Sequence, residues 1–99
     1  MINILEKNYI VIPEKIVQDK SLTPLSKLVF GKIYSLSKSE GYCWATNKFL
    51  AEYFNISKRT IGLCINLLVS NGYIYIKLQY KNQNNSKRKI YIVYDNIEY

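Results

Sequence analysis

One stretch of the sequence brings polar and basic side chains to helical spacing, so that they could face a ligand together. Positions i, i+4, i+7 and i+11 of a helix share one side, and here they hold guanidinium, apolar, amide and hydroxyl groups. Guanidinium and amide groups form paired hydrogen bonds with base edges, and lysine and hydroxyl groups bind phosphates. The pattern predicts a helix that enters the major groove of duplex DNA. The residues of this surface, with those that flank its start, are Ser57, Lys58, Arg59, Thr60, Leu63, Asn66 and Ser70.

Two short helices joined by a tight turn must hold that surface, and the sequence predicts both between residues 46 and 72. The first helix would begin at Thr46, whose hydroxyl can cap free backbone N–H groups, and would end at Asn55, which tolerates the left-handed conformation of a sharp turn. Ser57 would cap the second helix, and Gly72 would end it. The apolar positions expected to point inward are Leu50, Phe54, Ile56, Ile61, Cys64, Ile65 and Leu68.

This pair has the pattern of a helix-turn-helix, whose second helix reads DNA. An ordinary helical hairpin with a polar outer face is the plainer alternative. The caps, the turn Asn and the small Ala51 at the helix crossing together favour the helix-turn-helix. The start of the first helix adds a phosphate site, because its N–H groups and dipole attract anions. The residues of that site would be Thr46, Asn47 and Lys48.

After Gly72 the apolar period changes from that of a helix to that of a strand. Apolar and polar side chains alternate over residues 73–80 and again over 90–94, while the segment between them, KNQNNSKRK, is polar and indicates a long hairpin loop. A hairpin behind a recognition helix predicts a winged helix, with a wing over about residues 73–94 that follows phosphates or enters the minor groove. Taken alone, the charge run would equally suit a solvated, flexible hairpin. The expected wing contacts are Lys81, Lys87, Arg88 and Lys89.

The formal net charge of +7 is concentrated in the same half of the chain. Between Thr46 and Lys89 every charged residue except Glu52 is Lys or Arg, whereas residues 1–45 mix both signs and residues 90–99 are charged only at Asp95 and Glu98. A positive field over the proposed reading elements is what a phosphate-binding surface requires. A charge that only kept the protein soluble would be spread more evenly.

The first part of the chain is expected to be structural. Residues 8–13, NYIVIP, form a β-branched run stopped by proline, which predicts a short edge strand. That strand would lengthen a small sheet or cover the core, which we favour, or it would pair two subunits. Ile16 should pack inward on a single turn, and Thr23 with Pro24 should open a further helix. The apolar stripe expected on that helix is Leu25, Leu28, Val29, Ile33 and Leu36.

The aromatic residues leave two interpretations open. Trp44, in an extended segment between the helices, is expected in the core, sealing the first long helix against the helix-turn-helix, and a base-stacking platform is the alternative. The ten Tyr residues, together with several Lys, also suggest binding of single-stranded nucleic acid, in which aromatic rings stack on bases. Most of these Tyr fall on alternating strand positions, however, where half-buried packing explains them as well.

Catalysis, metals and membranes are disfavoured by composition. The chain has no His, no paired carboxylates on one element and no phosphate-cradling Gly loop, so we expect no enzyme, no cofactor and no metal site. Cys43 and Cys64 are isolated, which predicts two reduced, partly buried thiols, with a disulfide as the less favoured alternative. No long apolar run or signal peptide is present, so a soluble cytoplasmic protein is expected.

Five segments carry a family resemblance, and they are YIVIPEKI, LTPLSKLVFGKIYSL, GYCWAT, FLAEYFNISKRTI and NGYI. They resemble the N-terminal winged-helix domains of plasmid and phage replication initiators, the RepA-like and DnaD-like proteins of low-G+C bacteria, over about residues 8–94. The resemblance implies that residues 57–60 approach DNA, that Thr46 and Lys48 meet phosphate, and that two copies can pair through the N-terminal region. Such initiators usually continue into a second domain, so the sequence is either a fragment of one or a small stand-alone DNA-binding protein.

The sequence as a whole predicts an α+β winged helix-turn-helix, with a three-helix core, a C-terminal hairpin wing and a short N-terminal strand. Residues 1–99 would form one domain, with the helix-turn-helix at about 46–72. The expected function is sequence-specific binding of double-stranded DNA in replication initiation or transcriptional regulation of a phage or plasmid. The rival is a winged-helix module that docks a partner protein, which the apolar Leu63 in the reading face favours slightly and the clustered charge does not.

Overall fold

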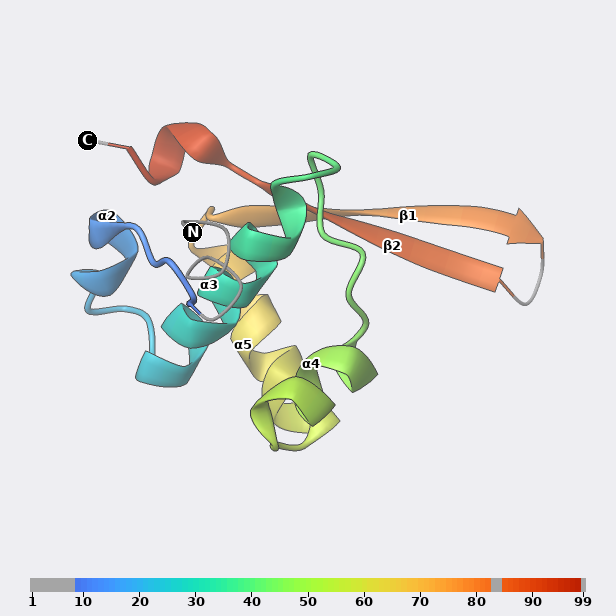
Figure 1. The fold of residues 1–99 in the computed structure, drawn as a ribbon, viewed down its shortest axis with the longest axis horizontal. Coiled ribbons are helices and arrows are strands. Elements are labelled where there is room, and N and C mark those ends of the chain that lie inside the picture. The colour runs from blue at the N-terminus through green and yellow to red at the C-terminus, as the bar shows by residue number, and fades with distance from the viewer. Residues whose placement is uncertain (1–8, 83–84, 99) are drawn as a thin grey trace.

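The helices of this protein lie against one side of an antiparallel hairpin that extends well beyond them, as Figure 1 shows. The computed structural model describes residues 9–82 and 85–98, and for residues 80–82, 85 and 86 it describes the backbone alone. This arrangement is the α+β winged helix-turn-helix that the sequence predicts. The elements in order are α2 (Glu14–Val17), α3 (Pro24–Ser37), α4 (Asn47–Phe54), α5 (Lys58–Ser70), β1 (Ile74–Asn82), β2 (Asn85–Ile92) and the 3-10 turn η1 (Tyr94–Asn96).

The three long helices begin at the capping residues that the sequence predicts. The Thr23 hydroxyl accepts a hydrogen bond from the Ser26 N–H at 3.1 Å, and Pro24 occupies the first helical position of α3. The Thr46 hydroxyl caps α4 in the same way, and Ser57 caps α5. Between α4 and α5 the turn is made by Asn55 in the left-handed conformation, with φ 58° and ψ 45°.

The core lies where α3 crosses α5 over the base of the hairpin. The predicted stripe of α5 is confirmed, since Ile61, Cys64, Ile65 and Leu68 are all buried. The predicted stripe of α3 is wrong at Leu28, which is exposed. The buried face of α3 instead begins at the small residue Ser26 and ends at the small residue Ser37, with buried residues every three or four positions between them. This face is therefore rotated relative to the expected stripe. The buried residues of α3 are Ser26, Val29, Phe30, Gly31, Ile33 and Ser37.

The predicted N-terminal edge strand is wrong within the part that the structure describes, residues 9–13, and Asn8 lies outside it. These residues form no strand but cross α3 at Gly31. A methyl group added to Gly31 would lie 2.1 Å from Cγ2 of Ile10 and 3.0 Å from Cγ1 of Ile12. The apolar run therefore packs Ile10 and Ile12 against a helix and leaves Tyr9 and Val11 exposed, and the absence of a side chain at Gly31 allows this close approach. Ile16 is buried on the single turn α2, as expected.

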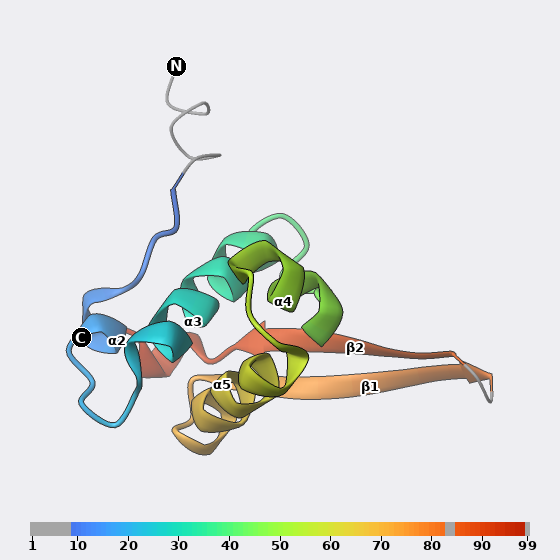
Figure 2. The same ribbon diagram turned by 90° about the horizontal axis from the view of Figure 1, so that it is seen from below.

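The hairpin is longer, and its loop shorter, than predicted. β1 continues through Lys81 to Asn82, and β2 begins at Asn85, so most of the expected loop KNQNNSKRK belongs to the two strands. The pairs Ile74–Ile92, Lys77–Lys89 and Gln79–Lys87 lie opposite one another. Polar side chains do not end these strands, because the ribbon projects into solvent beyond the helices and needs no buried face there (Figure 2). For the same reason Leu78, one of the apolar residues in the alternating pattern of residues 73–80, is exposed and does not reach the core.

An isolated bridge at Cys43, whose segment we call the short strand, and the C-terminal turn complete the sheet region. Cys43 pairs with Ile90 through two backbone hydrogen bonds of 2.8 Å. The predicted second strand ends at Ile92 instead of Tyr94, which belongs to η1. Ile97 is buried in the core, and Asn96 Nδ2 donates to the Gly72 carbonyl oxygen at 2.6 Å. The last residues, to which the sequence assigns no role, thus close the end of the core.

Candidate nucleic-acid interface

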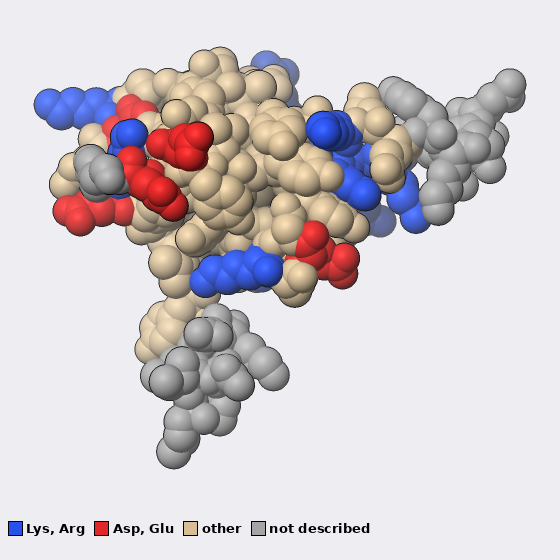
Figure 3. Space-filling view, turned by 90° about the horizontal axis from the view of Figure 1, so that it is seen from above, with Lys and Arg blue, Asp and Glu red and all other residues tan. Residues whose placement is uncertain are grey.

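Charge is distributed unevenly over the folded protein. On the face seen in Figure 3, lysine and arginine side chains gather beside the grey end of the hairpin, while most of the acidic side chains lie at the other end of the molecule. The folding of the chain therefore preserves the charge separation that the sequence shows. A polyanion would be attracted to the end formed by the wing and the adjoining helices.

The predicted reading face of α5 is one continuous exposed surface. Arg59, Asn66 and Ser70 are exposed, and Leu63 leaves 59% of its surface to solvent. The opposite face of the same helix is buried against α3 and α4, so α5 cannot turn without breaking the core. Figure 2 shows α5 on the side of the sheet that faces the viewer, where no other described element covers it. The helix thus presents a fixed set of polar groups to a ligand.

The two residues that flank the head of α5 first stabilise the helix itself. The Ser57 hydroxyl accepts from the Thr60 N–H at 3.1 Å, and its oxygen lies 2.9 Å from Thr60 Oγ1. Lys58 and Arg59 between them are exposed. The cap therefore leaves these two cations as the side chains that are free to reach outward from the first turn.

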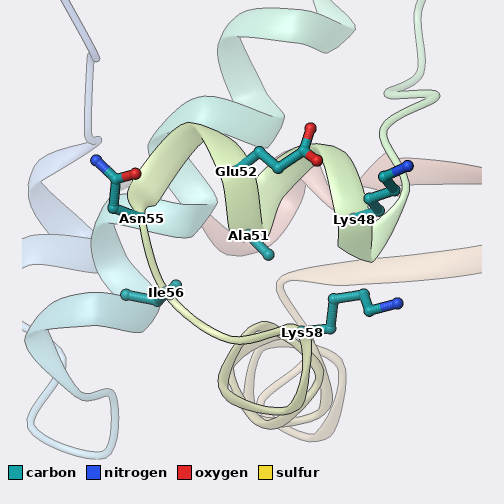
Figure 4. A pocket seen from close by; sticks show the side chains of 6 residues that line it. All are labelled: Lys48, Ala51, Glu52, Asn55, Ile56 and Lys58. Carbon is teal, nitrogen blue, oxygen red and sulfur yellow. The ribbon is translucent and has the colours of Figure 1, made fainter.

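A hollow of about 390 Å³ separates the starts of α4 and α5. Figure 4 shows that Lys48 and Lys58, one from the first turn of each helix, point toward the same side of this hollow. The N-termini of the two helices add partial positive charge at the same place. Two ammonium groups and two helix ends can therefore share the phosphates of one DNA strand. The residues that line the hollow are Lys48, Ala51, Glu52, Asn55, Ile56 and Lys58.

The other two predicted residues at the start of α4 are held by the fold. The Thr46 hydroxyl accepts from the Phe49 N–H at 3.0 Å, although the residue itself is exposed. Asn47 is half-buried, and its Nδ2 lies 3.6 Å from the position that a methyl group on Gly62 of α5 would take. Its Oδ1 is buried and has no hydrogen-bond partner among the described residues. Asn47 therefore fits the contact between α4 and α5 better than an open phosphate site.

The predicted wing contacts fall into different environments. Lys87 is exposed, and Lys89 holds its Nζ 4.6 Å from the ring centre of Tyr42. Arg88 is half-buried, with Nε donating to the Ala45 carbonyl oxygen at 3.0 Å and Nη2 buried without a partner among the described residues. Burial lowers the pKa of the Arg88 guanidinium, although such a group stays charged at neutral pH. Lys81 lies in β1, and its side chain is outside the described part of the structure.

The expectation that Trp44 belongs to the core is wrong, because 48% of its surface is exposed. Its indole packs against Phe49 at one edge, with ring centres 5.0 Å apart and an interplanar angle of 67°. The physical reason is the alternation of the short strand, in which Cys43 and Ala45 take the two buried positions. The small residues on either side of Trp44 were a signal of this orientation in the sequence.

The described residues hold no group of three or more His, Cys, Asp or Glu that could bind a metal ion. Cys43 and Cys64 are buried free thiols, as predicted, and burial raises the pKa of both. A protonated, buried thiol is a poor nucleophile. Within the same residues, no helix has the length and apolar composition that crossing a bilayer requires.

Helices joined by a left-handed Asn turn, an exposed polar face on the second of them and a basic hairpin behind it define a winged helix-turn-helix, a class of DNA-binding protein. The sequence model described as a helix-turn-helix domain matches residues 20–74, more than half of the chain. The chain therefore belongs to the helix-turn-helix domain family. The match covers α3, α4 and α5 and ends where β1 begins, so the wing is known from the structure. No curated protein and no solved structure matched the chain.

Proposed function

We propose that this protein binds double-stranded DNA in a sequence-specific way, with α5 in the major groove and the wing on the phosphate backbone. The observation that carries the proposal is the exposed face of α5, which begins with two exposed cations, Lys58 and Arg59, and continues through Asn66. In this arrangement Arg59 and Asn66 reach base edges, and Leu63 between them contacts thymine methyl groups. Thr46, Lys48, Ser57 and Thr60 then line the entrance to the groove, with hydroxyl and ammonium groups beside phosphates.

The wing supplies the second part of the interface. Lys77 and Lys89 lie directly opposite one another in the hairpin, a pairing of like charges that costs stability in the free protein. A phosphate between or beside them would remove that cost. Among the predicted wing contacts the geometry favours the exposed Lys87 over its neighbour Arg88, because the Arg88 guanidinium is bound to Ala45. These contacts would add affinity without sequence preference.

A docking site for a partner protein is the second candidate, and one observation favours it. Next to the exposed Leu63, an apolar hollow of about 480 Å³ lies between the start of α3 and the side of α5. This hollow would accommodate an aliphatic side chain of a partner protein. Positive charge at the same face suits DNA better. The residues that line this hollow are Thr23, Leu25, Thr60, Leu63, Cys64 and Leu67.

The biological process and the oligomeric state of the protein are also proposals. Replication initiation or transcriptional control of a phage or plasmid, in the cytoplasm, follows from the resemblance to RepA-like and DnaD-like proteins. Pairing of two copies through residues 9–12 is supported by the exposure of Tyr9 and Val11 beside α3. With the helices and hairpin acting as one domain, each copy would bring one recognition helix to a half-site.

Selection from a random pool of duplexes with the purified protein tests the function. We expect enrichment of one motif, which a protein-docking surface cannot produce. A palindromic motif would indicate a dimer, and a single asymmetric half-site a monomer. An unenriched pool, together with binding that does not respond to salt, would overturn the proposal.

A further inference from the structure

The side of the sheet that faces away from the helices carries an ordered set of aromatic and basic side chains. The antiparallel pairing of Cys43 with Ile90 places Tyr42 beside Tyr91 and Trp44 beside Lys89. The hairpin register then continues both rows across the sheet, with Tyr75 opposite Tyr91 and Lys77 opposite Lys89. The residues that alternate with these point toward the core and are buried there, including Cys43, Ala45, Ile74, Ile90 and Ile92. We call this outward surface the outer sheet face.

The first row is aromatic and is only partly covered. The rings of Tyr75 and Tyr91 are stacked, with centres 5.1 Å apart and an angle of 12°, and the rings of Tyr91 and Tyr42 lie 5.9 Å apart. Tyr75 leaves 44% of its surface exposed, and Trp44, which lies beside Lys89 next to this row, leaves 48%. Half-exposed rings of this size lose contact with water when a flat apolar ligand stacks on them. These rings therefore offer exposed stacking surfaces beyond the contacts that they make with one another and with Phe49.

The second row is basic, and no acid balances it within the sheet. Lys77 and Lys89 each lie over a ring of the aromatic row, at 5.5 Å from the centre of Tyr91 and 4.6 Å from that of Tyr42. The segments 42–46, 74–82 and 85–92 contain no Asp or Glu. Figure 3 views the protein from this side and shows the basic side chains gathered next to the hairpin end. An anionic ligand would neutralise the charge of these lysines.

Between the short strand and the hairpin the outer sheet face is hollowed. The cleft has a volume of about 550 Å³, within the range of 300–1,000 Å³ that is typical of sites for small ligands. Trp44 and Tyr42 form its aromatic side, and Lys87 and Lys89 its basic side. Arg88 also lines the cleft, although its guanidinium is turned to the core side of the sheet and bound to Ala45. The cleft can therefore hold one aromatic base together with its phosphate.

We infer that the outer sheet face binds unpaired nucleic acid, with bases stacked on Trp44 and Tyr75 and phosphates on Lys77, Lys87 and Lys89. A duplex cannot use exposed rings in this way, because the faces of its bases are covered by their neighbours, whereas every unpaired base offers a free face. The surface lies on the side of the sheet opposite α5 (Figures 1 and 2), so its stacking rings act independently of the recognition helix. Its lysines Lys77, Lys87 and Lys89 are shared with the wing proposed to bind duplex DNA. If both surfaces are used, the protein holds a duplex and an adjacent single strand together.

Trp44 is the single tryptophan of the chain, so its fluorescence reports on this surface alone. The protein is titrated with a short oligothymidylate single strand, and binding is followed by fluorescence anisotropy of a dye on the DNA. We expect saturable binding accompanied by quenching of Trp44, because a stacked base quenches indole emission. The absence of binding and quenching at low salt would overturn the inference.

Matched substitutions separate stacking from charge. Trp44→Ala and Tyr75→Ser should each weaken the single-strand complex by about five- to a hundredfold, the range expected for loss of one stacked base. Tyr94→Ser is the control, because Tyr94 also leaves 44% of its surface exposed but lies in η1, outside the sheet. Since both target side chains are half-exposed, the variants should fold, which circular dichroism checks, and Trp44→Phe should restore most of the affinity. Equal losses from Tyr94→Ser and Tyr75→Ser would contradict the assignment.

The same variants distinguish this inference from the proposed duplex function. Arg59→Ala should weaken binding to the selected duplex and leave the single strand unaffected, while Trp44→Ala should do the reverse. Loss of duplex binding alone would overturn the function proposed for α5 and leave this inference standing. Polyglutamate and vesicles containing phosphatidylserine serve as competitors. If either displaced the oligonucleotide at an equal charge concentration, the surface would be a general anion or lipid site, and the inference would be wrong.

Discussion

Arg88 donates a hydrogen bond from Nε to the carbonyl oxygen of Ala45, 3.0 Å away, and so ties the wing to the segment that leads into α4. The two residues are far apart in the sequence, but the pairing of Cys43 with Ile90 brings their strands together. Arg88 was expected on a solvated loop, among residues free to bind phosphate. Its position shows that one member of a basic run can be structural while its neighbours remain available for a ligand.

Replacement of Arg88 should therefore affect the fold more than replacement of Lys87. Arg88→Ala removes a charge-assisted hydrogen bond that is partly shielded from water, so the free energy of unfolding should fall by about 1–2 kcal/mol. Lys87→Ala, at an exposed neighbouring position, should change it by less than about 0.5 kcal/mol. Urea unfolding of both variants measures the difference. Equal stabilities would mean that the bond to Ala45 contributes nothing in solution.

Gly31 and Gly62 form a second matched pair, both within helices. Gly31→Ala should destabilise the protein by roughly 1–3 kcal/mol, because the added methyl group would collide with Ile10. Gly62→Ala meets only Asn47 Nδ2, at 3.6 Å, so its better helix propensity should leave stability unchanged or raise it by up to about 1 kcal/mol. Thermal unfolding checks both. A stabilising Gly31→Ala would show that residues 10–12 do not pack on α3.

The two buried thiols predict how the free energy of unfolding changes above neutral pH. Burial raises the pKa of Cys43 and Cys64 in the folded protein, so the unfolded chain ionises first, at about pH 8.5. The stabilising contribution is full below that pH and is lost as the pH rises toward the folded pKa, by up to about 1.4 kcal/mol per pH unit for each thiol. The free energy of unfolding is measured from pH 7 to 10. A variant with Cys43→Ala and Cys64→Ala should show a shallower decline, and an identical slope would contradict the assignment.

Binding to duplex DNA should weaken steeply as salt is added. If roughly five phosphates are contacted by the basic residues of α4, α5 and the wing, the log-log slope of affinity against salt should be about −4 to −5. Anisotropy titrations of the selected duplex at several salt concentrations measure it. A flat response would argue against contacts with the DNA backbone.

Arg59 and Lys87 should contribute to duplex binding in different ways. Arg59→Ala should relax specificity at one or two positions of the site, at a cost of about 1–3 kcal/mol there, because a guanidinium can form paired hydrogen bonds with guanine. Lys87→Ala should lower affinity for specific and random duplexes by similar factors and reduce the salt slope by about 1. Each variant is compared on the selected site and on scrambled DNA. The opposite pattern would reverse the roles assigned to α5 and the wing.

The helices and their ends could be predicted from the sequence because the signals that set them are local. Thr23, Thr46 and Ser57 each cap a helix through an N–H three residues ahead, and Asn55 makes its turn through its own backbone angles. Such interactions require no distant partner. The exposed face of α5 followed from the same periodicity, since a helix with one apolar stripe leaves its other side to solvent.

Only the tertiary structure decided which way the extended segments face and what they touch. Residues 9–13 have the composition of a strand, but Gly31 of α3 provides the surface on which they bury. The outward position of Trp44 and the anchoring of Arg88 both depend on the pairing of Cys43 with Ile90. The partner of a strand cannot be read from the sequence of that strand alone. A shift of one residue in the pairing register moves every side chain of the strand to the opposite face of the sheet. The outer sheet face, which joins three such segments, therefore exists only in the folded protein.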